Sequence, residues 1–168
     1  MTERGTGARL IIVCGLPGSG KTTHARRVEA ALGAVRFCPD EWIDSLEIDL
    51  FDEPARARIE QLQWGIAHRL LALGVPVIIE WGTWNRYERD TLRAAARQLG
   101  VPVELHFLDA PVDELWARVE ARDRELRPER RRLTRDDIAL YDTVIQRPDE
   151  EELASFDAPS VALDGEAN

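Results

Sequence analysis

The sequence predicts an α/β protein in which a parallel five-stranded sheet is sandwiched between helices. Apolar runs alternate along the chain with longer segments rich in helix-forming residues, a pattern typical of parallel sheets. The first apolar run, Leu10–Cys14, has no polar alternation, as expected of a strand buried on both faces. A glycine-rich stretch, Gly15–Thr22, follows it and leads into a helix-forming segment. Together these observations predict a strand, a tight loop and a helix at the centre of the fold.

The composition indicates an ordinary soluble chain of 168 residues, which we expect to form one domain over 1–168. The charged fraction is 32%, and no apolar stretch has the length of a membrane span or a signal peptide core. Cys14 and Cys38 are expected to be buried thiols in a reducing compartment, so the predicted location is cytoplasmic. The net charge of −9 argues against broad nucleic-acid binding, which depends on neutralising phosphates.

Further strands and helices follow in alternation. The expected strands after the first are Val35–Cys38, Val75–Ile79, Val103–Leu108 and Ser160–Leu163. Helices are expected from Lys21 to Leu32, from Pro54 to Leu73, up to Leu99, from Pro111, and from Thr134 to Arg147. In the second of these helices, spacings of three and four residues predict one buried face, made of Ile59, Leu62, Ile66, Leu70 and Leu73.

The stretch Gly15–Thr22 satisfies the G-x-x-x-x-G-K-[ST] pattern of a phosphate-binding loop. Glycines let successive N–H groups converge on one anion, and the helix N-terminus favours the same anion. Lys21, the only lysine of the chain, supplies a point charge for the β- and γ-phosphates, and Thr22 a hydroxyl for Mg²⁺. The predicted fold is therefore that of P-loop NTPases. The predicted ATP-binding residues are Gly15, Pro17, Gly18, Ser19, Gly20, Lys21, Thr22 and Thr23.

Two carboxylates follow predicted strands, at the edge where α/β sheets bind ligands. Glu80 can hold Mg²⁺ or its water shell opposite Thr22; the alternative is a solvated carboxylate at a strand end. Asp40 is a candidate general base for a substrate hydroxyl, and it can also cap a helix over residues 41–46.

Between Arg118 and Arg135 lie eight arginines, and this segment is predicted to be a lid. Arg118 and Arg122 share one helical face and can clamp a transferring phosphoryl group; the alternative is a solvated basic face. Trp81 and Trp84 flank Gly82, so one of them is a candidate for contact with a flat substrate. The histidines His24, His68 and His106 are interpreted as isolated structural residues.

Taken together, the chain resembles the small P-loop kinases that include polynucleotide kinases, chloramphenicol phosphotransferase and zeta toxins. The resemblance rests on GLPGSGKTT at 15–23, on Asp40 and Glu80 after their strands, and on the pair Arg118 and Arg122. It implies catalytic roles for Lys21, Asp40, Arg118 and Arg122, with ATP and Mg²⁺ as cofactors. The chain departs from the Asp-Asp-x-Arg pattern of polynucleotide kinases, because it reads Asp40-Glu41-Trp42-Ile43.

The leading hypothesis is therefore an ATP-dependent kinase that phosphorylates a small-molecule hydroxyl. A polynucleotide 5′-hydroxyl kinase and a non-catalytic ATP-binding regulator are the alternatives. A guanine-binding switch is excluded, because its Asn-Lys-x-Asp motif needs a second lysine. The oligomeric state stays open.

Overall fold

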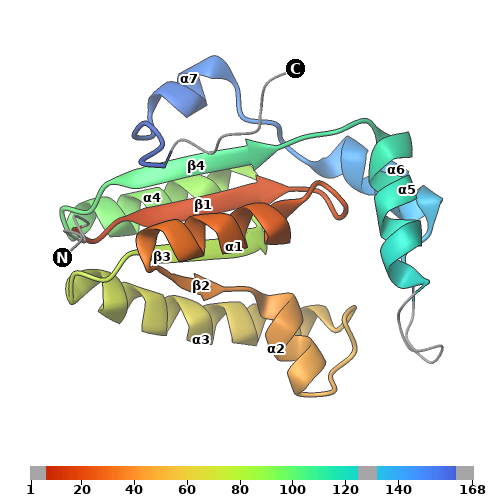
Figure 1. The fold of residues 1–168 in the computed structure, drawn as a ribbon, viewed down its shortest axis with the longest axis horizontal. Coiled ribbons are helices and arrows are strands. Elements are labelled where there is room, and N and C mark those ends of the chain that lie inside the picture. Colours follow the sequence, from red (N-terminus) through yellow and green to blue (C-terminus); the bar gives the residue numbers. More distant parts are fainter. Residues whose placement is uncertain (1–6, 125–131, 162–168) are drawn as a thin grey trace.

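The computed structural model describes residues 7–124 and 132–161 and shows an α/β fold with a parallel sheet (Figure 1). Its strands are β1 (Leu10–Gly15), β2 (Val35–Phe37), β3 (Val77–Gly82) and β4 (Val103–Leu108). Its helices are α1 (Lys21–Leu32), α2 (Pro39–Ser45), α3 (Glu53–Ala72), α4 (Arg86–Gln98), α5 (Val112–Asp123), α6 (Arg135–Val144) and α7 (Glu150–Ala154). No helix within the described ranges is long and apolar enough to cross a membrane.

The sheet has the strand order β2-β3-β1-β4, and every pairing is parallel. Strand β1 therefore lies between β3 and β4, and the loop that follows it emerges near the middle of the carboxyl edge. All connections between strands run through helices, as parallel pairing requires. This topology places residues that are distant in sequence, such as those after β1 and β3, beside one another.

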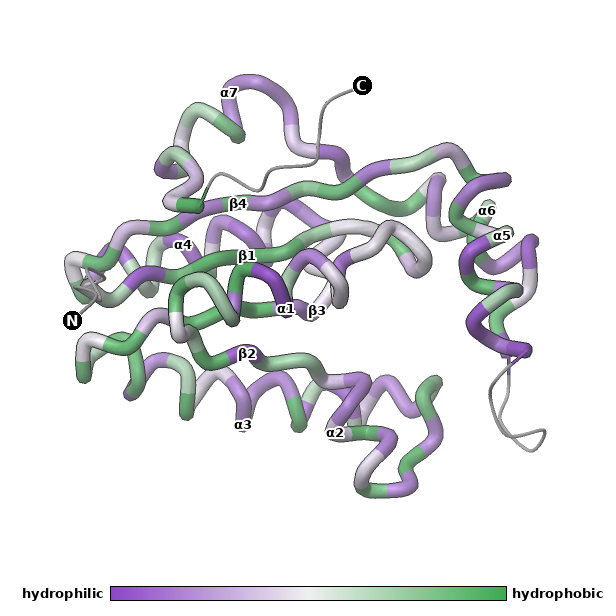
Figure 2. The backbone as a smooth tube through the Cα atoms, viewed as in Figure 1, coloured by the Kyte–Doolittle hydropathy of each residue, from purple (hydrophilic) through white to green (hydrophobic). Residues whose placement is uncertain are grey.

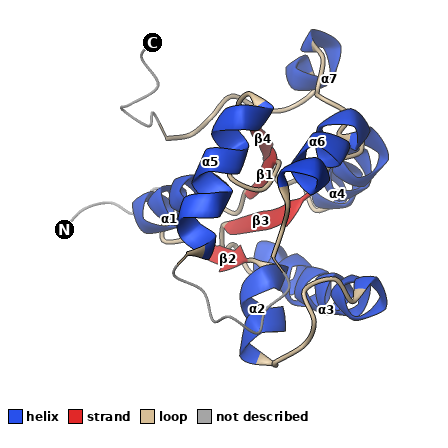
Figure 3. Cartoon of the chain, turned by 90° about the vertical axis from the view of Figure 1, so that its right-hand side faces the viewer, coloured by secondary structure: helices blue, strands red, loops and turns tan. Residues whose placement is uncertain are grey.

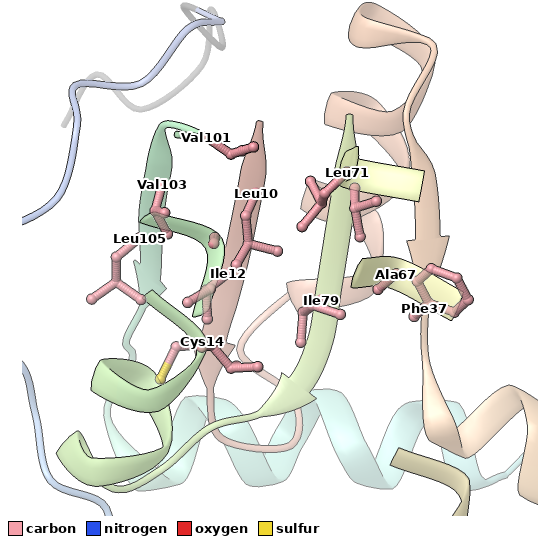
Figure 4. Packing of buried hydrophobic residues seen from close by; sticks show 13 residues of the cluster. Leu10, Ile12, Cys14, Phe37, Ala67, Leu71, Ile79, Val101, Val103 and Leu105 are labelled. Atoms are coloured by element: carbon pink, nitrogen blue, oxygen red, sulfur yellow. The ribbon is translucent and has the colours of Figure 1, made fainter. Parts of the chain in front are cut away.

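The two faces of the sheet bury alternate residues of the same strands. Ile11, Val13 and Ile78 pack against Ala25 and Val28 of α1. The opposite face packs against α3 and α4 through Leu10, Ile12, Cys14, Phe37, Ala67, Leu71, Val77, Ile79, Leu92, Ala96, Val101, Val103 and Leu105 (Figure 4). Figure 2 shows the resulting contrast between the apolar β1 and the outer helices, which alternate polar and apolar residues. The predicted sandwich of helices around a parallel sheet is confirmed.

A fifth strand at residues 160–163 is not confirmed. The described part of the chain has four strands, Ser160 and Val161 form none, and the other two residues lie outside it. The chain nevertheless runs beside β4 just before this point, because the Asp157 N–H donates to the Val103 carbonyl at 2.8 Å. Asp157 Oδ2 accepts the Val103 N–H at 2.7 Å, so a side chain takes a ladder position that a fifth strand would use.

The predicted buried face of α3 is confirmed at Ile59 but wrong at three of its other positions. Leu62, Ile66 and Leu73 are 64%, 44% and 78% exposed. The residues that face the sheet recur every four positions: Ala55, Ile59, Gln63, Ala67 and Leu71. This helix carries apolar residues on more than one side, so their spacing alone does not choose the packed one. Small alanines let the helix approach the sheet, and buried Gln63 accepts a hydrogen bond from Trp81 Nε1 at 2.9 Å.

Two boundaries also differ from the prediction. Strand β3 runs from Val77 to Gly82, so it continues past Glu80, where the sequence predicts its end. The last predicted helix ends at Val144, where Ile145 turns to an extended conformation, and the short helix α7 follows. Pro148 disfavours helical geometry in the residue before it, which explains why the helix does not reach Arg147.

Candidate active site

The phosphate-loop residues lie at the carboxyl edge of the sheet, between β1 and α1. Figure 3 looks onto this edge and shows α2, α5 and α6 around the strand ends. Gly20 caps α1 with a left-handed φ of 92°. A Cβ on Gly18 would lie 2.5 Å from the Leu115 carbonyl oxygen, so a side chain there would push α5 away from the loop. Gly15 ends β1, Pro17 is half-buried in the loop, and Thr23 is exposed in the first turn of α1.

Lys21 and Ser19 place polar groups inside this loop. Lys21 Nζ donates to the Leu16 carbonyl oxygen at 2.8 Å. Burial lowers the pKa of Lys21, and the charges of Glu80 and Asp40 act against that shift. Ser19 Oγ is buried and has no hydrogen-bond partner among the described residues. A half-buried ammonium and an unpaired hydroxyl beside a helix N-terminus fit an anionic ligand such as a nucleotide phosphate.

Thr22 and Glu80 meet as the sequence predicts. Thr22 Oγ1 donates to Glu80 Oε1 at 2.5 Å, and Glu80 is only 5% exposed, so it is no solvated strand-end carboxylate. One hydroxyl and one carboxylate next to a phosphate loop are the protein ligands that Mg²⁺ commonly uses, because it keeps several waters and takes phosphate oxygens. The donor set therefore fits the magnesium site that the sequence predicts.

Arg36 contacts the Glu80 carboxylate, and this contact was not predicted from the sequence. Its Nη1 donates to Glu80 Oε2 at 2.6 Å, and its Nη2 donates to Glu41 Oε1 at 2.6 Å. Although burial acts in the opposite direction, these contacts with Arg36 lower the pKa of Glu41. The strand register explains the encounter, since Arg36 pairs with Ile78 and Glu80 lies two residues further on the same face. An arginine inside a predicted strand, next to the strand that carries Glu80, was the available signal.

Asp40 lies in the first turn of α2 and does not cap it. The N-cap is Cys38, so the capping alternative for Asp40 is wrong. Asp40 Oδ1 accepts a hydrogen bond from Arg56 Nη2 of α3 at 2.5 Å. The Asp40 side chain is 59% exposed, in contrast to the buried Glu80.

The two candidate clamp arginines differ in their surroundings. Arg118 Nη1 donates to the Gly18 carbonyl oxygen of the loop at 3.2 Å, and Arg118 also pairs with Glu114. Arg122 Nη2 donates to Asp123 Oδ1 at 3.1 Å. Helix α5 itself is anchored over the loop, because Leu115 and Val119 pack with Leu16 in one apolar cluster. Of the predicted lid at 118–135, residues 125–131 lie outside the described ranges.

The turn after β3 connects the loop to the C-terminal helices. Trp84 Nε1 donates to the Gly15 carbonyl oxygen at 3.2 Å, and the Trp84 ring contacts the Tyr141 ring. Thr83 has a φ of 46°, which is unusual for a β-branched residue. Fully buried Arg89 holds this turn by donating to the Thr83 carbonyl at 2.9 Å while pairing with Glu152 of α7. Trp84 is thereby positioned as part of the wall of the phosphate loop.

The histidines are not all isolated, contrary to the sequence interpretation. His24 Nε2 and His106 Nδ1 are 2.8 Å apart, and His106 Nε2 lies 3.0 Å from Glu104 Oε2. Residues of α1 and β4 therefore share a polar contact that no local pattern reveals. Cys14 and Cys38 are free and buried, as predicted, and burial raises the pKa of Cys38 to about 11.

Comparison with known protein families shows the family to which the chain belongs. The AAA domain family matches residues 10–148, which covers the sheet, the phosphate loop and α5. The chain belongs to this family, and its fold is that of the P-loop kinases, as the sequence predicts. A search of curated protein sequences finds no match to the chain.

Solved structures with the same fold include several kinases. A chain of the Pnkp1/Rnl/Hen1 RNA repair complex is 21% identical with a TM-score of 0.72; the match covers 93% of this chain and 48% of that one. The present chain thus spans about half of that protein's length. A gluconokinase from Sinorhizobium meliloti is 23% identical (TM-score 0.58, coverage 87% and 79%). Kti12 from Chaetomium thermophilum, solved with ADP-AlF3, is 21% identical (TM-score 0.64, coverage 84% and 82%). At these identities, the likeness shows the fold.

Proposed function

We propose that this protein is an ATP-dependent kinase that transfers the γ-phosphoryl group to a hydroxyl of a small molecule. The observation that carries the proposal is that the phosphate loop, the Thr22–Glu80 pair and Asp40 share one edge of the sheet. Burial lowers the pKa of Lys21, and the charges of Glu80 and Asp40 oppose that shift, so the three groups lie within electrostatic reach of one another.

Each side chain has a role that phosphoryl transfer requires. The loop N–H groups and Lys21 hold the β- and γ-phosphates, while Arg118, at the Gly18 carbonyl, and Arg122 stabilise the charge that develops on the transferred group. Mg²⁺, held by Thr22 and through water by Glu80, would neutralise phosphate charge. Asp40 accepts or orients the acceptor hydroxyl proton.

We assign a small-molecule acceptor because α2 lacks an arginine that could bind the phosphate of a nucleic-acid substrate. Ile43 stands where polynucleotide kinases carry an arginine for a substrate phosphate, and Ile43 is 1% exposed. A buried apolar side chain offers a phosphate nothing to bind.

A polynucleotide 5′-hydroxyl kinase is the second candidate, and one observation favours it. The RNA repair complex gives a TM-score of 0.72 over 93% of this chain, whereas the gluconokinase gives 0.58. A non-catalytic ATP-binding regulator would use Lys21 but would need neither Asp40 nor the paired arginines.

The test is release of ADP from ATP and Mg²⁺, with γ-labelled ATP to identify the phosphorylated product. We expect acceptor-dependent ADP release and label in a small alcohol or sugar. Label only in DNA or RNA 5′-ends would establish the second candidate. ATP binding without turnover in the presence of any acceptor would establish the regulator.

A further inference from the structure

Arg56 contacts the candidate base, Asp40, directly. It belongs to α3, sixteen positions after Asp40, and its Nη2 lies 2.5 Å from Asp40 Oδ1. The Arg56 side chain is 21% exposed, so the guanidinium is held more firmly than a surface arginine. Asp40 sits on a short helix and is 59% exposed, and therefore depends on such a partner to keep one orientation.

The charge of Arg56 is shared with other carboxylates. Arg56 Nη1 lies 3.7 Å from Glu60 Oε1, one turn further along α3. The charges of Asp40, Glu60 and Glu53 raise the pKa of Arg56 against the effect of burial. Burial raises the pKa of Glu60 to about 7; the charge of Arg56 acts against this shift, and the charge of Glu88 on α4 adds to it. The Arg56 guanidinium therefore interacts electrostatically with several carboxylates at once.

We propose that Arg56 is a positioning residue for Asp40, and that the acceptor side built by Asp40, Arg56 and Glu60 takes an uncharged polyhydroxyl compound. This inference rests on the kinase function proposed above and specifies its substrate class. Asp40, Arg56 and Glu60 together offer a substrate hydroxyl both hydrogen-bond acceptors and donors, since carboxylate oxygens accept and the guanidinium donates. An acceptor phosphate would meet the charge of Asp40, whose arginine is already paired, and such a like charge disfavours binding.

The positioning role follows from the demands of transfer. A base must hold its carboxylate within hydrogen-bond reach of the acceptor hydroxyl, and a misplacement of about 1 Å can cost on the order of 10²-fold in rate. The contact from Arg56 fixes one oxygen of Asp40 and leaves the other available to the hydroxyl.

The experiment compares Arg56→Met and Arg56→Lys with Arg58→Met, which removes an exposed arginine from the same helix. Each protein is assayed with γ-labelled ATP on a panel of sugars and sugar alcohols, each beside its monophosphate, and on an oligonucleotide with a free 5′-hydroxyl. Thermal melting of each variant checks folding.

We expect the wild type to prefer an uncharged polyol over its monophosphate by about 10²-fold or more in kcat/KM. Arg56→Met should lower kcat on that polyol by about 10- to 100-fold, leave KM for ATP unchanged, and recover in part in Arg56→Lys. Arg58→Met should match the wild type.

Three results would overturn the inference. If Arg56→Met keeps full kcat, or if Arg58→Met loses as much, the positioning role is wrong while the kinase stands. If the wild type phosphorylates only monophosphates or the oligonucleotide, the substrate class is wrong and the kinase again stands. If the wild type transfers label to no acceptor at all, the kinase function fails and the inference fails with it.

Discussion

The nucleotide side and the acceptor side of the candidate site are built in different ways. The nucleotide side consists of consecutive residues of one loop, closed by Glu80, which is 5% exposed and held by Thr22 and Arg36. The acceptor side is assembled from α2 and α3, and Asp40 is more than half exposed and depends on one long side chain. The first side is fixed by backbone geometry and burial, the second by side chains that can find other partners.

This difference bears on how such proteins vary. A side chain on Gly18 would collide with α5, so the loop tolerates little change. Within the described residues, Arg56 and Glu60 form no ion pair or hydrogen bond with the loop, so we expect changes there to alter the acceptor side alone. Variants on the nucleotide side should therefore lose ATP turnover altogether. Variants on the acceptor side should lose only transfer to the acceptor.

Lys21→Ala should have the largest effect and define the nucleotide side. Removing the half-buried ammonium takes away charge that stabilises the transferred phosphoryl group, so ATP turnover should fall by about 10³-fold or more, with or without acceptor. Arg27→Ala, an exposed residue of the same helix, is the matched control. ADP release measures turnover and melting checks the fold; undiminished turnover in a folded Lys21→Ala protein would show that the loop is not catalytic.

Asp40→Asn should affect the acceptor side alone. The change keeps the size of the side chain but removes the base, so transfer should fall by roughly 10²–10⁴-fold while ATP affinity and stability stay near native. Asp44→Asn, one turn further on α2, is the control. Product formation and nucleotide titration separate the two effects. Native transfer by a stable Asp40→Asn protein would mean that Asp40 serves only its contact with Arg56.

The sequence predicts the nucleotide side better because its determinants are local. The strand Leu10–Gly15, the loop and the helix ending before Gly33 follow from neighbouring residues, and Glu80 follows from its place at the predicted end of a strand. The contacts of Arg36, Arg56 and Arg89 join elements that only the tertiary fold brings together. Arg56 and Arg89 lie in helices, where an arginine is usually solvated. The buried face of α3 was predicted only in part for the same reason, since the sheet selects Gln63 and Ala67 over larger apolar residues.

Substitutions of Arg118 and Arg122 test whether α5 belongs to the nucleotide side. Arg118 already contacts the loop, so Arg118→Ala should raise KM for ATP as well as lower kcat. Arg122→Ala should depress kcat by about 10-fold or more with little change in ATP affinity, because its contact is expected to strengthen in the transition state. Arg124→Ala, at the exposed end of the helix, is the control. Equal, small effects of all three would indicate a solvated basic face.

Glu60→Gln should have the smallest effect, on stability, and it tests the electrostatic basis of the acceptor side. Folding raises the pKa of Glu60 from 4.5 to about 7, chiefly through burial and against the charge of Arg56. Between these values the folded protein holds a proton that the unfolded chain has released, so the free energy of unfolding falls as pH rises from 4.5 to 7 and this loss is constant above.

Glutamine cannot ionise, so the free energy of unfolding of the variant should not fall over this pH range. We expect Glu60→Gln to match the wild type near pH 4.5 and to exceed it by about 1–2 kcal/mol at pH 8, a difference discounted because the side chain retains some contact with water. Denaturant unfolding at both pH values measures it, with the exposed Glu151→Gln as control. A gain of equal size at both pH values, or none at pH 8, would mean that Glu60 is ionised at little cost. Glu60 would then be fully charged at neutral pH and would repel an acceptor phosphate together with Asp40.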